Sequence, residues 1–298
     1  MRLLVVTQIV DTHDPILGFF HRWLEEFSKH FESIEVICLK EGTHSLPKNI
    51  HVHSLGKENG GNSVVYAVRF IGLVWKLRTQ YDHVFVHMNP IYIVLVGWWW
   101  QLTKKRIGLW YTHKSTDMKL RIALMFSNAI FTASKESFRL SSKKVHVTGH
   151  GIDTDFFKPD SRIERGSHLL SVGRLMKSKR HDLAIHAAKD ADVALRIAGE
   201  GGERERLTAL ARELGVQVTF LGGLTQLGLR DEYLTAAKLI HRSETGSLDK
   251  VVLEAAACGC LVDTTDLALK NLPLSPEYVR EHHSLQKLIP CIQKAYSL

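Results

Sequence analysis

Residues 168–182 read HLLSVGRLMKSKRHD, and this stretch decides the fold of the second half of the chain. An apolar strand stops at Gly173, and Arg174 and Lys179 follow it. A turn that follows a strand of a parallel sheet lies at the edge where such sheets bind ligands. Two cations there would suit a diphosphate, since arginine offers a planar fork and lysine a mobile charge. A solvated basic loop is the alternative, because two further cations belong to the same stretch.

A second informative stretch is 243–259, SETGSLDKVVLEAAACG. Ser247 or Asp249 can cap a helix that begins near Lys250. A lysine in the first turn opposes the helix dipole, so it is better tolerated where an anion is bound. Glu254 lies one turn further on, and a surface ion pair with Lys250 is one reading of it. A carboxylate in so apolar a helix is either paired or binds the hydroxyls of a ligand, and we favour the ligand.

Strands and helices alternate on both sides of an irregular, charged segment at 153–167, which we interpret as a linker. The pattern predicts two doubly wound α/β domains with parallel sheets, at residues 1–155 and 165–298. In the first half, strands are expected at 3–7, 34–39, 83–87, 106–112, 129–133 and 144–147, and helices at 19–31, 63–79, 91–102 and 119–126. In the second half, strands are expected at 168–172, 194–198, 217–221 and 238–241, and helices at 181–188, 203–214, 230–236, 250–258 and over 276–297.

The composition is that of a globular protein, with 45% hydrophobic residues and 23% charged residues in a chain of 298. Lys and Arg number 39 against 31 Asp and Glu, which favours phosphorylated ligands, anionic membranes or nucleic acid as partners. The four cysteines lack zinc-site spacing, and Cys258 and Cys260 lie in an apolar run that predicts buried thiols. These cysteines fit a reducing compartment, and the short apolar N-terminus lacks the features of a signal peptide.

The most apolar stretch, IYIVLVGWWWQL at 91–102, is followed by Lys104–Arg106. Twelve residues are too few to cross a bilayer, which takes about 20. We favour a helix in the core. The alternative is a surface patch whose aromatic and basic edge touches a membrane, with Arg69, Lys76 and Arg78 as further contacts.

Four spans together resemble the retaining nucleotide-sugar glycosyltransferases that include bacterial mannosyltransferases and sucrose synthase (glycosyltransferase family 4-like, group 1 glycosyl transferases). The similarity is clear over residues 145–260 and looser in the N-terminal half. The spans, in order, are HGIDTDFFKP (150–159), LLSVGRLMKSKRHDLAIHAA (169–188), LRIAGEGGERERLTALARELGVQVTFLGGL (195–224) and YLTAAKLIHRSETGSLDKVVLEAAACG (233–259).

This resemblance implies a GT-B fold, in which two Rossmann-like domains face each other across a cleft, here with a shortened C-terminal domain. It implies a sugar donor activated by a nucleoside diphosphate, transfer to an acceptor hydroxyl with the anomeric configuration retained, and no metal. The acceptor would be a glycan, a polysaccharide or a lipid-linked precursor. No nucleic-acid partner is expected, and the location would be the cytoplasm, with peripheral contact at the inner face of the membrane as an option.

The resemblance also implies roles for individual residues. Arg174 and Lys179 match the pair that neutralises the diphosphate, Glu254 matches the glutamate that binds the ribose, and His87 matches a histidine that approaches the sugar. His113 follows the next strand, where acceptor contacts are common. The remaining expected donor contacts are Gly18, Gly173, Gly222, Gly223, Leu224, Ser247, Leu248, Asp249 and Lys250.

Two features depart from the family pattern. The glutamate usual eight residues before the ribose-binding one is replaced by Gly246, and we expect Glu244 or Asp249 to substitute only if the loop is reshaped. The chain after Cys260 is also short. A non-catalytic nucleotide-sugar-binding protein of the same fold is therefore the alternative to an active transferase.

Overall fold

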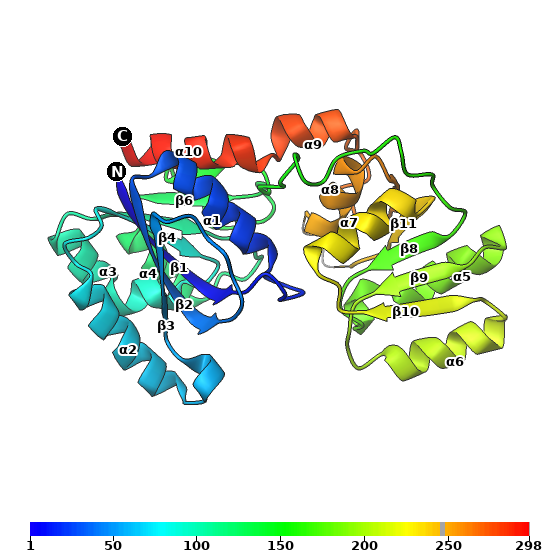
Figure 1. Cartoon of the computed structure of the whole chain (residues 1–298), viewed down its shortest axis with the longest axis horizontal. Coiled ribbons are helices and arrows are strands. Elements are labelled where there is room, and N and C mark those ends of the chain that lie inside the picture. The colour runs from blue at the N-terminus through cyan, green and yellow to red at the C-terminus, as the bar shows by residue number, and fades with distance from the viewer. Residues whose placement is uncertain (245–247, 298) are drawn as a thin grey trace. The chain divides into compact units, whose positions relative to one another are not determined.

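The computed structural model describes residues 1–244 and 248–297, which form two α/β units (Figure 1). Unit 1 comprises Met1–Gly151 together with Leu285–Leu298, and unit 2 comprises Ile152–Ser284. The division thus differs from the predicted second domain of 165–298, because the end of the chain belongs to unit 1. The reason is the amphipathic character of the last helix, which buries Leu288 and Ile292 completely.

Unit 1 is built on a seven-stranded sheet with the order β3-β2-β1-β4-β5-β6-β7, in which every pair of neighbours is parallel. Long apolar runs form these strands because both faces of a parallel sheet are covered by helices. The strands are β1 (Arg2–Val10), β2 (Ser33–Glu41), β3 (Ile50–Ser54), β4 (His83–His87), β5 (Arg106–Trp110), β6 (Ala129–Thr132) and β7 (Val145–Val147).

Helices cover the two faces of this sheet separately. Helices α2 (Ser63–Lys76), α3 (Ile91–Leu102) and α4 (Met118–Phe126) pack over one face, around a core that includes Phe70, Trp100 and Leu120. On the other face α1 (Phe19–His30) lies beside α10 (Leu285–Ser297) (Figure 1). The Tyr296 hydroxyl of α10 donates a hydrogen bond of 2.7 Å to the main-chain carbonyl of Val84, which anchors the last helix to the sheet.

Unit 2 is built on a five-stranded parallel sheet with the order β10-β9-β8-β11-β12. Its strands are β8 (Leu169–Val172), β9 (Leu195–Ala198), β10 (Val218–Gly222), β11 (Lys238–His241) and β12 (Leu261–Thr264). Its helices are α5 (His181–Ala191), α6 (Arg204–Leu214), α7 (Gln226–Thr235), α8 (Lys250–Ala257) and α9 (Pro276–His282). Two short 3₁₀ turns complete the described elements, η1 (Lys57–Asn59) in unit 1 and η2 (Lys177–Lys179) in unit 2.

The sequence pattern missed two strands and misjudged the tail. β3 and β12 each lie at one edge of their sheet, and both are short. The tail holds α9 and α10 where one helix was expected, and α10 contains Pro290. The predicted burial of Cys258 and Cys260 is confirmed, as is that of the helix 91–102 on its sheet-facing side.

Candidate functional site

The strand order of the unit 2 sheet reverses between β8 and β11, which is the topological switch point of this sheet. From β8 the chain adds β9 and then β10 on one side, and it afterwards adds β11 and β12 on the other side. The loops that follow β8 and β11 therefore diverge from neighbouring strand ends, and doubly wound sheets bind ligands at this position. The first loop carries Lys179 and the second leads to Asp249, which precedes α8.

Lys179, Asp249 and His241 form a charged cluster at this position. The Lys179 ammonium donates a hydrogen bond of 2.7 Å to Asp249 Oδ2. His241, the last residue of β11, places Nε2 at 2.8 Å from the same oxygen, while its Nδ1 lies 2.9 Å from Oγ1 of Thr264. Burial alone would raise the pKa of Asp249, but the hydrogen bond from His241 and the Lys179 charge outweigh it and hold this pKa well below its usual range. Asp249 thus fixes the lysine at the N-terminal end of α8.

Glu254 is buried one turn into α8. Its side chain is 3% exposed, and Oε1 lies 3.3 Å from the Lys250 ammonium. The Tyr233 hydroxyl donates a hydrogen bond of 3.3 Å to Oε2. Burial raises the pKa of Glu254, and the neighbouring Lys250 charge counteracts part of that rise. The pair with Lys250 considered from the sequence exists, but it is not a surface pair.

Close main-chain contacts join the loops that follow β8, β9 and β10. A Cβ on Gly199 would lie 1.9 Å from the carbonyl oxygen of Gly173, and both residues have positive φ, so this contact requires glycine. The Leu175 amide donates to the carbonyl of Glu200 at 2.8 Å. The Gly223 amide donates in turn to the Glu200 carboxylate at 3.4 Å. The expected donor contacts at Gly173 and Gly223 therefore lie along the edge of the sheet that carries the charged cluster.

The other expected residues of unit 2 divide into three groups. Gly222 ends β10 with φ +71°, Leu224 follows it half-buried, and Leu248 is buried. Arg174 is exposed, and in the part of the chain that the structure describes its side chain makes no hydrogen bond or ion pair. The predictions for Gly246 and Ser247 concern positions outside the described residues.

Neither carboxylate considered as a replacement for the usual sugar-contacting glutamate stands alone. Glu244 accepts a hydrogen bond of 2.6 Å from Arg180, and Asp249 is held by Lys179 and His241. Both are therefore engaged with cationic or hydrogen-bonding side chains of unit 2 in this structure.

Two expected site residues of unit 1 lie at its own switch point, between β1 and β4. His87 ends β4, but it is 1% exposed and stacks on Phe20 at a ring distance of 4.3 Å. The catalytic role that the resemblance implies for His87 stays a prediction. Gly18 caps α1 and its amide already donates to the carbonyl of Asp14 at 2.9 Å. A Cβ there would lie 2.5 Å from that oxygen, so the turn itself requires this glycine.

His113 follows β5 and is exposed, as a residue that contacts an acceptor would be. Its Nδ1 accepts a hydrogen bond of 3.1 Å from the Ser115 amide, which orients the ring. Across residues 1–244 and 248–297, no group of three or more His, Cys, Asp or Glu side chains is arranged to hold a metal ion. Over the same residues, no helix has both the length and the apolar character needed to cross a membrane.

Sequence reasoning missed His241 and Tyr233. His241 could have been noticed, because a histidine at the end of an apolar strand reaches the ligand-binding edge of the sheet. Tyr233 lies in the last turn of α7, the helix before β11, and gave no such signal, since its role depends on its contact with Glu254 of α8.

Comparison with known proteins finds a family match within the second unit. Residues 153–280 match the family model of the glycosyl transferases group 1. A relative from Campylobacter jejuni, N-acetylgalactosamine-N,N'-diacetylbacillosaminyl-diphospho-undecaprenol 4-alpha-N-acetylgalactosaminyltransferase, is 31% identical over 140 residues, 44% of this chain and 37% of that protein. D-inositol 3-phosphate glycosyltransferase from Streptomyces bingchenggensis is 31% identical over 166 residues, 47% of this chain and 35% of that protein. The matched part thus spans little more than a third of either relative.

Solved structures resemble the whole chain in fold. Anabaena HepE in complex with UDP and glucose has a TM-score of 0.73 at 14% identity, covering 100% of this chain and 99% of that one. Sucrose-phosphate synthase from Thermosynechococcus elongatus has a TM-score of 0.72 at 14% identity, covering 100% of this chain and 98% of that one. The fold is GT-B, with two Rossmann-like parallel-sheet units, and the stretch 153–280 is similar to the glycosyl transferases group 1.

Proposed function

We propose that this chain transfers a sugar from a nucleoside-diphosphate sugar to an acceptor hydroxyl. The observation that carries the proposal is the Lys179–Asp249 ion pair at the N-terminal end of α8, in a unit that matches the group 1 glycosyl transferases. The helix end and the nearby Lys250 add positive potential to that of Lys179. Arg174 follows β8 in the same loop as Lys179. Its planar guanidinium supplies two parallel N–H donors for a phosphate.

In the proposed reaction the bond between the anomeric carbon and the diphosphate oxygen breaks as the acceptor oxygen attacks. Negative charge grows on the departing diphosphate, and Arg174, Lys179 and the end of α8 stabilise it. The diphosphate oxygen takes the proton of the acceptor hydroxyl on the same face of the sugar, so the anomeric configuration is retained. Glu254 binds the donor ribose, Gly222–Leu224 receive the base, and the reaction needs no metal.

The acceptor is a glycan, a polysaccharide or a lipid-linked precursor in this proposal, and His113 contacts it. The name of the Campylobacter jejuni relative includes a diphospho-undecaprenol, which supports testing a lipid-linked acceptor first. Anomeric retention is checked by NMR of the product, and independence of metal by turnover in the presence of a chelator.

A panel of UDP-, GDP- and ADP-sugars, read by thermal shift, identifies the donor, because a ligand of the native state raises its stability. With that donor, acceptor-dependent release of nucleoside diphosphate should fall about 100-fold or more in Arg174→Ala. Arg212→Ala, at an exposed arginine of α6, is the matched control and should keep its activity. Equal activity of the two variants would contradict the assignment of Arg174.

The second candidate is a non-catalytic nucleotide-sugar-binding protein. Glu244 is paired with Arg180 and Asp249 with Lys179, which argues against either acting as the sugar-contacting carboxylate. This candidate predicts saturable binding of a nucleoside diphosphate and no transfer to any acceptor of the classes above. Acceptor-dependent release of the diphosphate would exclude it.

A further inference from the structure

Helix α2 carries apolar side chains on both of its sides. It buries Phe70 and Val74 against the sheet. On the opposite side it exposes Val68 and Trp75, which are 65% and 57% accessible. A group of large exposed apolar side chains is typical of a surface that contacts a partner or a membrane. The outer side of α2 therefore needs a partner other than water.

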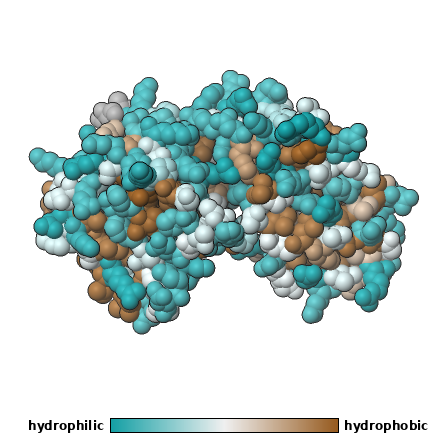
Figure 2. Space-filling view, viewed as in Figure 1, coloured by the Kyte–Doolittle hydropathy of each residue, from teal (hydrophilic) through white to brown (hydrophobic). Residues whose placement is uncertain are grey.

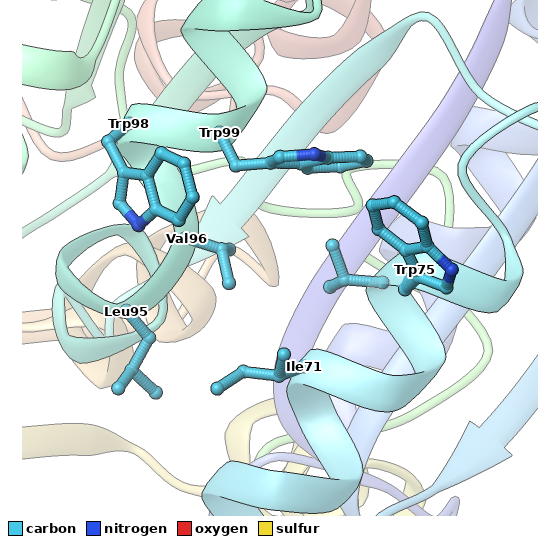
Figure 3. A pocket seen from close by; sticks show the side chains of 7 residues that line it. Ile71, Trp75, Leu95, Val96, Trp98 and Trp99 are labelled. Carbon is cyan, nitrogen blue, oxygen red and sulfur yellow. The ribbon is translucent and has the colours of Figure 1, made fainter.

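The apolar surface continues from α2 onto α3. The two helices enclose a hollow of about 230 Å³, which Figure 3 shows between the aromatic rings of Trp75 and Trp98 and the side chains of Ile71 and Leu95. Trp75 and Trp99 approach to a ring distance of 5.8 Å across it. Hydrophobic side chains gather at the lower left of Figure 2, where Figure 1 places α2. We call this the α2–α3 surface; its exposed members are Val64, Val65, Val68, Ile71, Trp75, Trp98 and Leu102.

Positive charge lies beside this surface. Residues 59–135 contain ten Lys and Arg against two Asp and Glu, so this quarter of the sequence carries a net charge of +8, the value for the whole chain. The cations and anions of the remaining residues cancel. Lys76 is the last residue of α2, Arg78 lies two residues after it, and Lys104 follows α3. The Arg78 guanidinium lies 4.8 Å from the centre of the Trp75 ring, so charge and apolar surface adjoin.

The exposed apolar side chains and the neighbouring cations together indicate which kind of partner binds the α2–α3 surface. A second copy of the chain would bring the same cations against this surface, and the like charges would repel. A nucleic acid would need aromatic faces on which bases stack, whereas Val64, Val68, Ile71 and Leu102 make this surface largely aliphatic. An anionic lipid bilayer satisfies both features, because tryptophan and aliphatic side chains enter the interface while Lys and Arg contact the headgroups.

We propose that the α2–α3 surface of unit 1 binds the surface of an anionic membrane, with a lipid acyl chain entering the hollow between the two helices. Insertion of Trp75 and Trp98 supplies the apolar part of the binding, and Lys76, Arg78 and Lys104 supply the electrostatic part. The proposal concerns unit 1 and is tested without a sugar donor, so its failure is distinct from that of the proposed transfer reaction.

The test is co-sedimentation of the whole chain with vesicles of phosphatidylcholine alone and of phosphatidylcholine mixed with phosphatidylglycerol. We expect binding to the mixed vesicles that weakens as salt is added, since counterions screen the cations. The double variant Lys76→Glu with Lys104→Glu should bind the mixed vesicles more weakly, by a factor of about 25 or more. Each lost cation accounts for a factor of about five. The matched control is Lys189→Glu with Lys270→Glu, at exposed lysines of unit 2, which should bind as the unchanged chain does.

The apolar part is tested by Trp75→Ser with Trp98→Ser, which should weaken binding about tenfold or more. Leu227→Ser with Leu267→Ser, at exposed leucines of unit 2, is its control. Circular dichroism confirms folding, and the lysine variants provide a second reading if the tryptophan variants fail to fold. Equal binding by variants and controls would overturn the proposal. So would a concentration-dependent dimer that only the tryptophan variants dissociate, or binding of a single-stranded oligonucleotide without binding of vesicles.

Discussion

Replacing Asp249 by asparagine should destabilise unit 2, because the carboxylate balances a cation in a nearly enclosed site. Its side chain is 15% exposed and that of Lys179 is 16% exposed. Removing one partner of a buried ion pair costs about 3–5 kcal/mol of unfolding free energy. Asparagine keeps one oxygen as an acceptor. We therefore expect Asp249→Asn to lower the unfolding free energy by about 3 kcal/mol, near the low end of this range.

The matched control is Asp263→Asn on β12 of the same sheet. Asp263 accepts a hydrogen bond of 2.8 Å from Arg242, but its side chain is 44% exposed. Water therefore screens this pair, and its loss should cost about 0–1 kcal/mol.

The assay is urea unfolding followed by two signals. All six tryptophans lie in unit 1, at positions 23, 75, 98, 99, 100 and 110, so tryptophan fluorescence reports unit 1 alone. Far-ultraviolet circular dichroism reports the helices of both units. We expect Asp249→Asn to move the dichroism transition to lower urea and to leave the fluorescence transition in place. Equal losses in Asp249→Asn and Asp263→Asn would refute the reasoning, as would a shift confined to fluorescence.

The same variant should show a pH dependence of defined sign. The folded state holds the pKa of Asp249 below its unfolded value of about 3.9. Such a group contributes stability above the unfolded pKa, and the contribution is lost as the pH falls through the folded pKa. The difference between the unchanged chain and Asp249→Asn should therefore be constant above about pH 5 and shrink below about pH 4. A difference that grows on acidification would contradict this assignment.

Other variants test the fold. Tyr296→Phe removes a buried hydrogen bond of α10, so it should cost about 1 kcal/mol, seen in tryptophan fluorescence because α10 belongs to unit 1. Gly199→Ala should cost about 2 kcal/mol or more, seen in dichroism, since its Cβ would meet the carbonyl of Gly173 at 1.9 Å. Burial raises the pKa of the Cys38 thiol to about 12, so a thiol reagent at neutral pH should modify the exposed Cys291 and leave Cys38 intact.

Apolar periodicity was enough to predict most of the fold, and it failed where side-chain burial is one-sided. The edge strand β3, IHVHS, carries two histidines among its five residues, so its pattern is not that of a buried parallel strand. Helix α7 begins earlier than its apolar pattern suggests, because the Thr225 hydroxyl accepts the Gly228 amide and caps it. The C-terminal pattern of α10 was found, but no local signal says which unit a helix joins.

The sequence predicted those parts of the candidate site that lie at a recognisable strand end or helix start. Lys179 and Asp249 were each selected because one follows a strand and the other precedes a helix. Their contact across 70 positions could not be read from the pattern, since it depends on β8 and β11 becoming neighbours. His87 was selected by its match to the family, and packing by Phe20 and Trp23, which encloses its ring, could not be read from the sequence.

The return of α10 to unit 1 gives unit 2 the topology of an inserted module. Its first residue, Ile152, donates its amide to the carbonyl of His283 at 2.7 Å, so the entry and the exit of the module are already joined by a hydrogen bond. A continuous polypeptide of 152–284 could therefore be exchanged as one cassette between related scaffolds, whereas unit 1 can be isolated only by splicing Gly151 to Leu285.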